Sequence, residues 1–205
     1  ASLGMLALGA GRDDLARRHA AQSIAVDGNA PDGHVVLAYL ELEKRDFDQA
    51  ATHASDALER GSNDTDLFMI LGDSYVDGRN SKKPNATQAR VNMYENAINV
   101  SPRRLDAYYE LTEALFALEK PREEDAKFLD LGLTAFPGED WLRVGQAVVK
   151  YRLAQREVAM TTLDTVLRPE STLDETQRNY AAQLRTGWLV DAMNSEIQVA
   201  LSKHD

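Results

Sequence analysis

The residue types that most often carry catalysis or metal binding are sparse in this chain and lack the spacing that such chemistry needs. The four histidines, His19, His34, His53 and His204, fall on different units of the chain without paired spacing, and no HExxH or similar ligand cluster occurs. Cysteine is absent, so thiolate metal sites and disulfides are excluded. No GxSxG elbow, Walker loop or glycine-rich dinucleotide turn is present. The sequence therefore predicts no zinc site, no cofactor and no enzymatic activity.

The overall charge of the chain argues against nucleic acid as a partner. The formal net charge is −10, with 33 acidic and 23 basic residues, whereas a nucleic-acid-binding protein needs a basic face to neutralise phosphates. No stretch approaches the roughly 18 consecutive apolar residues that read as a membrane span. We therefore expect no nucleic acid and no membrane insertion, and we expect a protein or peptide partner with basic and apolar residues.

The elements that must position any binding residue recur every 34 residues through the first two units. The first unit contains Leu3-Gly4, Gly11, Ala16, Ala20 and Ile24, and these recur as Leu37-Ala38, Arg45, Ala50, Ala54 and Leu58. Leu71-Gly72 follows one further period along the chain. A fixed period of this length is typical of a helical solenoid.

The second unit predicts one helical hairpin. A helix should begin at Pro31-Asp32 and break at Lys44-Arg45-Asp46, and a second, alanine-rich helix should begin near Phe47 and end at Gly61. Glycines inside the helical pattern, such as Gly72, indicate places where helices approach closely.

This pattern resembles the tetratricopeptide repeat, a two-helix unit with Leu-Gly and Tyr on its first helix and Ala, an aromatic residue and a second Ala on its second helix, followed by Pro. The third unit is similar to it in Leu71-Gly72, Tyr75, Tyr94, Ala97-Ile98 and Pro102. The resemblance implies an all-α fold, a right-handed α-α superhelix of about five to six helical hairpins with a C-terminal capping helix or hairpin.

The predicted domains are a repeat array over 1–169 and a capping segment over 170–205. The units of the array are assigned to about 1–30, 31–64, 65–104, 105–137 and 138–169. Thr172 with Glu175 indicates a capping box, and 172–203 is either one helix or a hairpin broken near Gly187.

Two departures from the repeat pattern stand out. Segment 78–87 indicates a lengthened loop, which is either a source of specificity or a tolerated insertion. Arg90 and Asp125 occupy the position of the small residues Ala16 and Ala50, which would shift or splay those hairpins.

Acidic residues begin the first helix of four successive units, where they would offset the helix dipole or line an acidic rim. They are Asp32, Asp66, Asp106, and Glu139 with Asp140.

The resemblance also implies a concave groove along the first helices. Projected onto this sequence, its rows contain Ala1, Val35, Met69, Tyr109 and Leu142, then Met5, Tyr39, Asp73, Glu113 and Gln146, then Leu8, Leu42, Val76, Phe116 and Val149. The candidate partner-binding residues are Val35, Tyr39, Asp66, Met69, Asp73, Tyr109, Glu113, Phe116, Leu142 and Gln146.

These observations predict a noncatalytic protein-interaction scaffold that binds a peptide or helix in an acidic and apolar groove. The chain begins inside a helical pattern without an initiator Met, so the alternative is a spacer or docking segment of a larger protein, such as a bacterial export component or an enzyme with an appended repeat region. Self-association through exposed repeat edges, at Leu3 and Leu6, is a third hypothesis. The Ala- and Arg-rich composition leans towards a bacterial source. The sequence does not determine the compartment; we expect a soluble fragment, which would be cytoplasmic or periplasmic in a bacterium.

Overall fold

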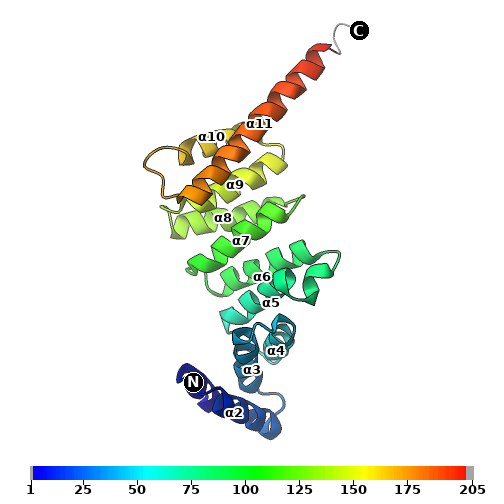
Figure 1. Ribbon diagram of the computed structural model, residues 1–205, viewed down its shortest axis with the longest axis vertical. Helices are drawn as coiled ribbons and strands as arrows, with labels where there is room; N and C mark the ends of the chain where they lie inside the picture. Colours follow the sequence, from blue (N-terminus) through cyan, green and yellow to red (C-terminus); the bar gives the residue numbers. More distant parts are fainter. Residues whose placement is uncertain (1, 202–205) are drawn as a thin grey trace. The chain divides into compact units, whose positions relative to one another are not determined.

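The computed structural model describes residues 2–201, and all regular structure within that range is helical (Figure 1). The all-α prediction is confirmed. Ala1 and His204, which the sequence analysis names, and residues 202 and 203 of the predicted cap lie outside the described range. No helix of the described chain combines the length and the apolar character needed to cross a membrane.

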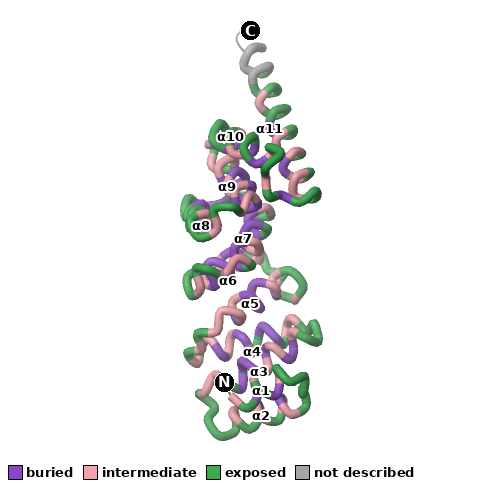
Figure 2. Tube along the Cα trace, turned by 90° about the vertical axis from the view of Figure 1, so that its left-hand side faces the viewer, coloured by how far each residue is buried: buried purple, intermediate pink, exposed green. Residues whose placement is uncertain are grey.

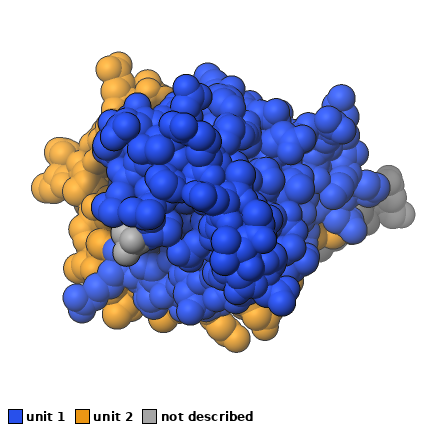
Figure 3. All heavy atoms as spheres, turned by 90° about the horizontal axis from the view of Figure 1, so that it is seen from below, with its two compact units in different colours: residues 1–114 blue, residues 115–205 orange. Residues whose placement is uncertain are grey.

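The described helices follow one another as five pairs and a final single helix. The pairs are α1 (Leu3–Gly9) and α2 (Asp13–Val26), α3 (Asp32–Glu43) and α4 (Phe47–Glu59), α5 (Thr65–Asp77) and α6 (Ala86–Val100), α7 (Leu105–Ala117) and α8 (Glu123–Ala135), and α9 (Asp140–Arg152) and α10 (Arg156–Val166). The last helix is α11 (Glu175–Leu201). The chain divides within α7 into two compact units, 1–114 and 115–205 (Figure 3). The repeat boundaries proposed from the sequence stay predictions.

Small residues form the core of the first unit, as the repeat pattern predicts. Ala50, Ala54 and Ala57 on α4 are fully buried in one cluster with Leu67 and Ile70 of α5. Buried stretches recur on successive helices along this unit in Figure 2. Because an alanine side chain ends at Cβ, α4 can lie close to both neighbouring helices while its other face stays in water.

Gly72 and Gly4 are among the helical glycines at which a neighbouring side chain leaves no room for a Cβ atom. A Cβ on Gly72 would lie 2.4 Å from Cε1 of Tyr94, and one on Gly4 would lie 2.8 Å from Cγ2 of Val36. The interpretation of these glycines as close helix contacts is confirmed.

One turn conformation ends the first helix of three hairpins. Gly11, Arg45 and Ala154 have positive φ angles of 66°, 59° and 62°, and the Arg45 amide donates to the carbonyl of Leu42 at 2.8 Å. This left-handed turn closes the free carbonyls at a helix C-terminus. It explains why Gly11 and Arg45 correspond in the 34-residue register, and it confirms the predicted break before Phe47.

The segment after α5 is a longer connection, as expected, and it contains the 3-10 helix η1 (Arg79–Lys82). The backbone and the side chain of Arg79 are both held by Asp48 of the preceding hairpin. The Arg79 amide donates to Oδ1 of Asp48 at 2.7 Å, and the Arg79 guanidinium lies 2.7 Å from Oδ2. The connection therefore packs against α4 at a defined place.

Both polar residues that replace alanines are satisfied by neighbours. Asp125 is fully buried and accepts hydrogen bonds from the amide and guanidinium of Arg122, at 2.5 Å and 2.6 Å. Arg90 donates to Tyr94 and pairs with Glu110. Burying a charged group is tolerated where such partners exist.

The C-terminal segment is one helix that continues through Gly187. The predicted capping box of Thr172 with Glu175 is wrong, because α11 begins at Glu175 and the reciprocal bonds join Asp174 and Gln177. The Gln177 amide donates to Asp174 at 2.8 Å, and the Asp174 amide donates to Gln177 at 3.2 Å. The box is shifted by two residues from the sequence prediction.

Thr172 instead ties the approach to α11 to the start of α9. Its amide donates to Oδ2 of Asp140 at 2.9 Å, and its hydroxyl accepts from the Asp140 amide at 3.1 Å. Further along, the rings of Tyr151 and Trp188 stack with centroids 4.1 Å apart. These contacts hold α11 against the last hairpin of the second unit.

Candidate functional site

A line of polar side chains joins three successive first helices in the first unit. It consists of Tyr39 on α3, Asp64 and Asp66 at the start of α5, and Arg104 and Asp106 at the start of α7, and we call it the polar line. The Tyr39 hydroxyl donates to Asp66 at 2.6 Å, with Asp64 at 3.1 Å. Arg104 pairs with Asp66 and also bonds Asp106 at 2.8 Å. One guanidinium thus lies between carboxylates of two repeats.

Local helix-capping requirements place these carboxylates. Asp64 is the N-cap of α5, and its side chain accepts the amide of Asp66 at 3.0 Å. Asp66, Asp106, Asp32 and Asp140 each lie in the first turn of their helix, where a negative charge is favourable. The expected position of these acidic residues in the first turn is confirmed, whereas the N-cap bond of α5 comes from Asp64, which was not among the residues predicted from the sequence.

Contacts within the polar line shift the pKa values of three of its groups, Arg104, Asp106 and Tyr39. The hydrogen bonds with Asp106 and Asp66 raise the pKa of Arg104, and the Arg104 guanidinium lowers the pKa of Asp106. Burial, followed by the hydrogen bond to Asp66 and the charge of Asp64, raises the pKa of Tyr39. Tyr39 therefore remains a donor and Asp106 remains ionised. The polar line contains three carboxyl groups, those of Asp64, Asp66 and Asp106, and one guanidinium, that of Arg104.

A second group, the Tyr94 cluster, consists of Asp73, Arg90, Tyr94 and Glu110. The buried Tyr94 hydroxyl donates to Asp73 at 2.9 Å and accepts from Arg90 at 3.3 Å, and Arg90 lies 3.1 Å from Glu110. Burial raises the pKa of Asp73, the bond from Tyr94 opposes this, and the charge of Glu110 adds to it. The cluster ties α5, α6 and the first unit's part of α7 together.

The candidate partner-binding residues differ in exposure. Val35, Met69 and Leu142 are 8%, 9% and 0% exposed, so their side chains lie inside the fold. Glu113 is exposed. The others are partly exposed: Tyr39, Asp66, Asp73, Tyr109, Phe116 and Gln146. Their role towards a partner stays a prediction, and the exposed fraction decides which of them could touch one.

Two candidates in the second unit are engaged by their own neighbours. The ring of Phe116 lies 5.1 Å from that of Trp141 and 4.9 Å from that of Tyr180, measured between centroids. The Gln146 amide donates to Asp130 at 2.5 Å. A partner that reached these side chains would meet an aromatic cluster with an adjoining polar group.

The fold also joins residues that sequence spacing left apart. Asp66 and Arg104 are 38 positions apart, and Tyr94 and Asp73 are 21 apart. The sequence did contain one sign of the contact between Arg104 and Asp66. Arg104 lies two residues before Asp106, and a long cationic side chain at that position can also reach the acidic start of the preceding repeat. The expectation that the histidines are dispersed is wrong for His34 and His53, which belong to one hairpin and lie 3.4 Å apart.

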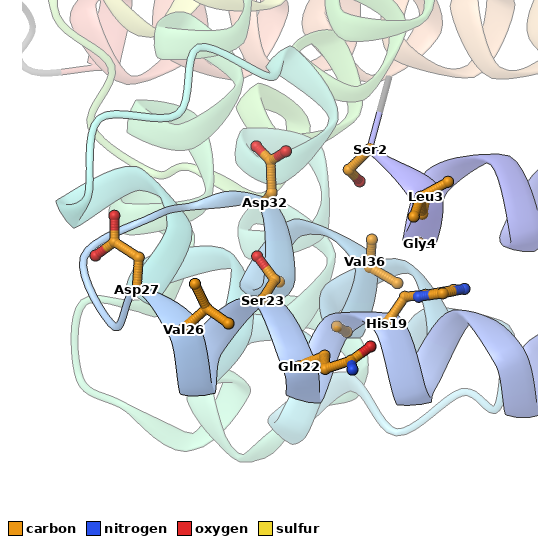
Figure 4. A pocket seen from close by; sticks show the side chains of 12 residues that line it. Ser2, Leu3, Gly4, His19, Gln22, Ser23, Val26, Asp27, Asp32 and Val36 are labelled. Carbon is orange, nitrogen blue, oxygen red and sulfur yellow. The ribbon is translucent and has the colours of Figure 1, made fainter.

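An open hollow lies at the N-terminal end of the first unit (Figure 4). It has a volume of about 380 Å³ and is lined by α1, α2 and the start of α3, including His19, Asp32 and Val36. Leu3 at its rim is 66% exposed and Val26 is 86% exposed. The hollow therefore combines exposed apolar side chains with polar ones, which come from Ser2, His19, Gln22, Ser23, Asp27 and Asp32.

Comparisons with solved structures place the architecture. The chain is similar to "YrrB: a TPR protein with an unusual peptide-binding site", with 16% identity, a TM-score of 0.66 and 88% of each chain covered. It is also similar to MamA, at 13% identity and a TM-score of 0.57 over 91% of this chain and 98% of that one. A further MamA structure, AMB-1, gives 16% identity and a TM-score of 0.61 over 84% and 91%.

The sequence matches no protein-family model and no curated protein. The likeness is therefore one of fold, carried by helix positions at low sequence identity. Together with the paired helices and the 34-residue register, it shows that this chain has the fold of tetratricopeptide-repeat proteins.

Proposed function

We propose that this chain is a noncatalytic protein-interaction scaffold whose first unit binds a peptide or helix that carries basic and apolar residues. The observation that supports this function is the polar line, in which partly exposed carboxylates of successive repeats are held by Arg104 and Tyr39. The line presents more negative than positive charge. A repeat array offers such a surface without a closed pocket.

A basic partner gains from carboxylates that are already held in place. A Lys or Arg of the partner would form charge-assisted hydrogen bonds, which are stronger than neutral ones. Because Asp66 and Asp106 are fixed by the helix starts and by Arg104, little side-chain entropy is lost on binding. The surrounding negative field would also speed encounter with a basic partner.

The partly exposed aromatic residues supply apolar anchors. Tyr39 and Tyr109 lie on α3 and α7, on the rows that the repeat register assigns to the groove. Tyrosine contributes a large contact area at low entropic cost, which suits a central anchor. The peptide-binding site of YrrB, a protein of similar fold, agrees with a peptide partner.

The partner's chemistry can be tested without knowing its identity. Peptides selected from a random display library against the intact chain should be rich in Lys, Arg and apolar residues. One selected peptide should then bind the double variant Asp66→Lys with Asp73→Lys at least tenfold more weakly, or about 1.4 kcal/mol. Fluorescence anisotropy measures the affinity, and circular dichroism checks that the helices persist.

Glu43→Lys with Glu59→Lys is the matched control. Both glutamates are exposed at the ends of α3 and α4 and have no ion pair among the described residues. The control makes the same change in net charge away from the polar line, so affinity should stay near the wild-type value. Equal losses in both double variants would show that only net charge matters, and the selection of acidic peptides would refute the proposal.

A single variant separates binding from folding. Asp66 and Asp73 have partners inside the unit, whereas Glu113 is exposed and has neither a hydrogen bond nor an ion pair within the described chain. Glu113→Lys should therefore weaken peptide binding with no loss of thermal stability. If Glu113→Lys binds the peptide as tightly as the wild type, this part of α7 does not contact the partner.

A further inference from the structure

Two histidines and a carboxylate converge between the helices of the second hairpin. His34 lies on α3, and His53 and Asp56 lie one helical turn apart on α4. Nδ1 of His34 is 3.4 Å from Nδ1 of His53 and 3.5 Å from Oδ2 of Asp56. One ligand atom from each residue lies within 4.8 Å of the other two. This histidine-aspartate triad is separate from the polar line.

Two of the three ligand distances in the triad match the edges of a small coordination tetrahedron. Zinc binds imidazole nitrogen at about 2.0–2.1 Å and carboxylate oxygen at about 2.0–2.2 Å, so two ligand atoms of a tetrahedral site lie roughly 3.3 Å apart. The distances from Nδ1 of His34 to His53 and to Asp56, 3.4 Å and 3.5 Å, come within about 0.2 Å of that value. The third distance, between His53 and Asp56, is within 4.8 Å, and rotation of these two partly exposed side chains would complete the site.

The facing nitrogens make a cation a favourable partner. Each neutral imidazole has one protonated and one unprotonated nitrogen, so the contact between two facing Nδ1 atoms is favourable only when one ring is protonated at Nδ1 and the other presents its lone pair there. His34 is only 8% exposed, and little water reaches its ring to relieve such a contact. A metal ion would accept the lone pairs of both nitrogens at once.

The carboxylate is oriented by a neighbouring arginine. Arg60 donates to Oδ1 of Asp56 at 2.9 Å and to its backbone oxygen at 2.7 Å, and it also bonds the carbonyl of Gly28 at 2.9 Å. Oδ1 is thereby engaged, and Oδ2 lies towards His34. Outer bonds that orient a ligand in this way are a regular feature of metal sites.

We propose that His34, His53 and Asp56 bind a zinc ion, with water in the fourth position. Two nitrogens and one oxygen suit zinc or a similar divalent transition metal, whereas calcium and magnesium require more oxygen ligands. The ligands come from both helices of the hairpin, so the ion clamps α3 to α4. The site stabilises the second hairpin, and this role is independent of the partner-binding function proposed above.

Zinc titration of the intact chain, carrying no histidine tag, tests the site. Isothermal titration calorimetry with zinc chloride should show one saturable site per chain, and zinc should raise the melting temperature. Hydrogen exchange should slow mainly in α3 and α4. Cobalt should give the strong visible absorption of a tetrahedral site, whereas magnesium and calcium in excess should not displace zinc.

Conservative variants decide whether the triad is responsible. His53→Gln and Asp56→Asn should each weaken zinc binding more than tenfold, and both residues are partly exposed, so the hairpin should still fold. His19→Gln, which alters a histidine of α2 outside the triad, should bind zinc like the wild type. Absence of saturable zinc binding, or unchanged affinity in His53→Gln and Asp56→Asn, would overturn the proposal.

Discussion

Replacing Gly72 by alanine should destabilise the first unit, although alanine is the better helix former. The new Cβ would lie 2.4 Å from Cε1 and 2.7 Å from Cζ of Tyr94, well inside normal contact distance. Tyr94 is fully buried, and its hydroxyl donates to Asp73. The ring therefore cannot withdraw without losing that bond, and the strain must spread into α5 and α6.

The expected net cost is about 1–2 kcal/mol, near the middle of the range of about 0–3.7 kcal/mol that the following terms allow. Overpacking a buried site costs about 1–3 kcal/mol, and a weakened bond from Tyr94 to the Asp73 carboxylate adds up to about 1.5 kcal/mol. Helix propensity returns about 0.8–1.0 kcal/mol when alanine replaces glycine. For a chain of this size each kcal/mol changes the melting temperature by about 2–4 °C, so Gly72→Ala should melt about 2–8 °C lower than the wild type.

Gly187→Ala is the matched control, because Gly187 lies inside α11 with no atom within 4 Å of an added Cβ. Only the propensity gain acts there, so this variant should be stabilised by up to about 1 kcal/mol. Thermal melting followed by circular dichroism measures both variants. Since repeats can unfold in parts, hydrogen exchange in α5, α6 and α11 assigns each change to its helix.

The two glycine variants should change stability in opposite directions. If Gly72→Ala melts at or above the wild-type temperature, the close contact with Tyr94 is not what requires glycine at position 72. A double variant sharpens the test: on a Tyr94→Leu background the ring is gone, and adding Gly72→Ala should cost little or nothing. A full penalty on that background would also contradict the reasoning.

Three further predictions concern the turns, the polar line and the repeat edge. Arg45→Gly should raise stability by up to about 1 kcal/mol in urea unfolding, because glycine adopts the positive φ at this turn without strain; a loss would refute this. Arg104→Gln should lower the melting temperature at neutral pH, because Arg104 lowers the pKa of Asp106 and Asp106 contributes stability only while it is ionised. The difference in melting temperature should shrink as the pH falls below the ordinary carboxyl pKa of about 4. A difference that does not depend on pH would count against this prediction. Leu3 and Leu6 are 66% and 61% exposed and are the residues expected to mediate self-association. Light scattering should then show oligomers that grow with concentration and that the double variant Leu3→Ser with Leu6→Ser abolishes. A strict monomer at high concentration would rule out self-association through this edge.

Local sequence signals were sufficient for the hairpins and their turns. The alanines of α4 and Gly72 are buried because each repeat presses the same small face against its neighbours, and that requirement appears in the sequence at a fixed period. The capping box before α11 was misplaced by two residues. Thr172 has the right chemistry for a cap, but tertiary contacts with Asp140 use its hydroxyl and amide first.

The pairs that form the candidate site depend on how successive repeats stack. Whether Arg104 reaches Asp66 depends on the stagger between α5 and α7, which the repeat period alone leaves open. The approach of His34 to His53 likewise depends on how α3 packs against α4. Spacings of 38 and 19 positions match no local motif, so these contacts required the structure.

The position of the carboxylates implies a division of roles on the proposed binding surface. Asp66 already accepts Tyr39 and Arg104, so a partner's lysine must compete with a fixed guanidinium for it. Glu113 has no such competitor within the described chain and can bond a partner directly. Asp66 therefore contributes mainly to the negative field, which governs association rates and their salt dependence, and Glu113 contributes mainly to the dissociation rate. Charge reversal at Asp66 should cost stability as well as binding, whereas reversal at Glu113 should cost binding alone.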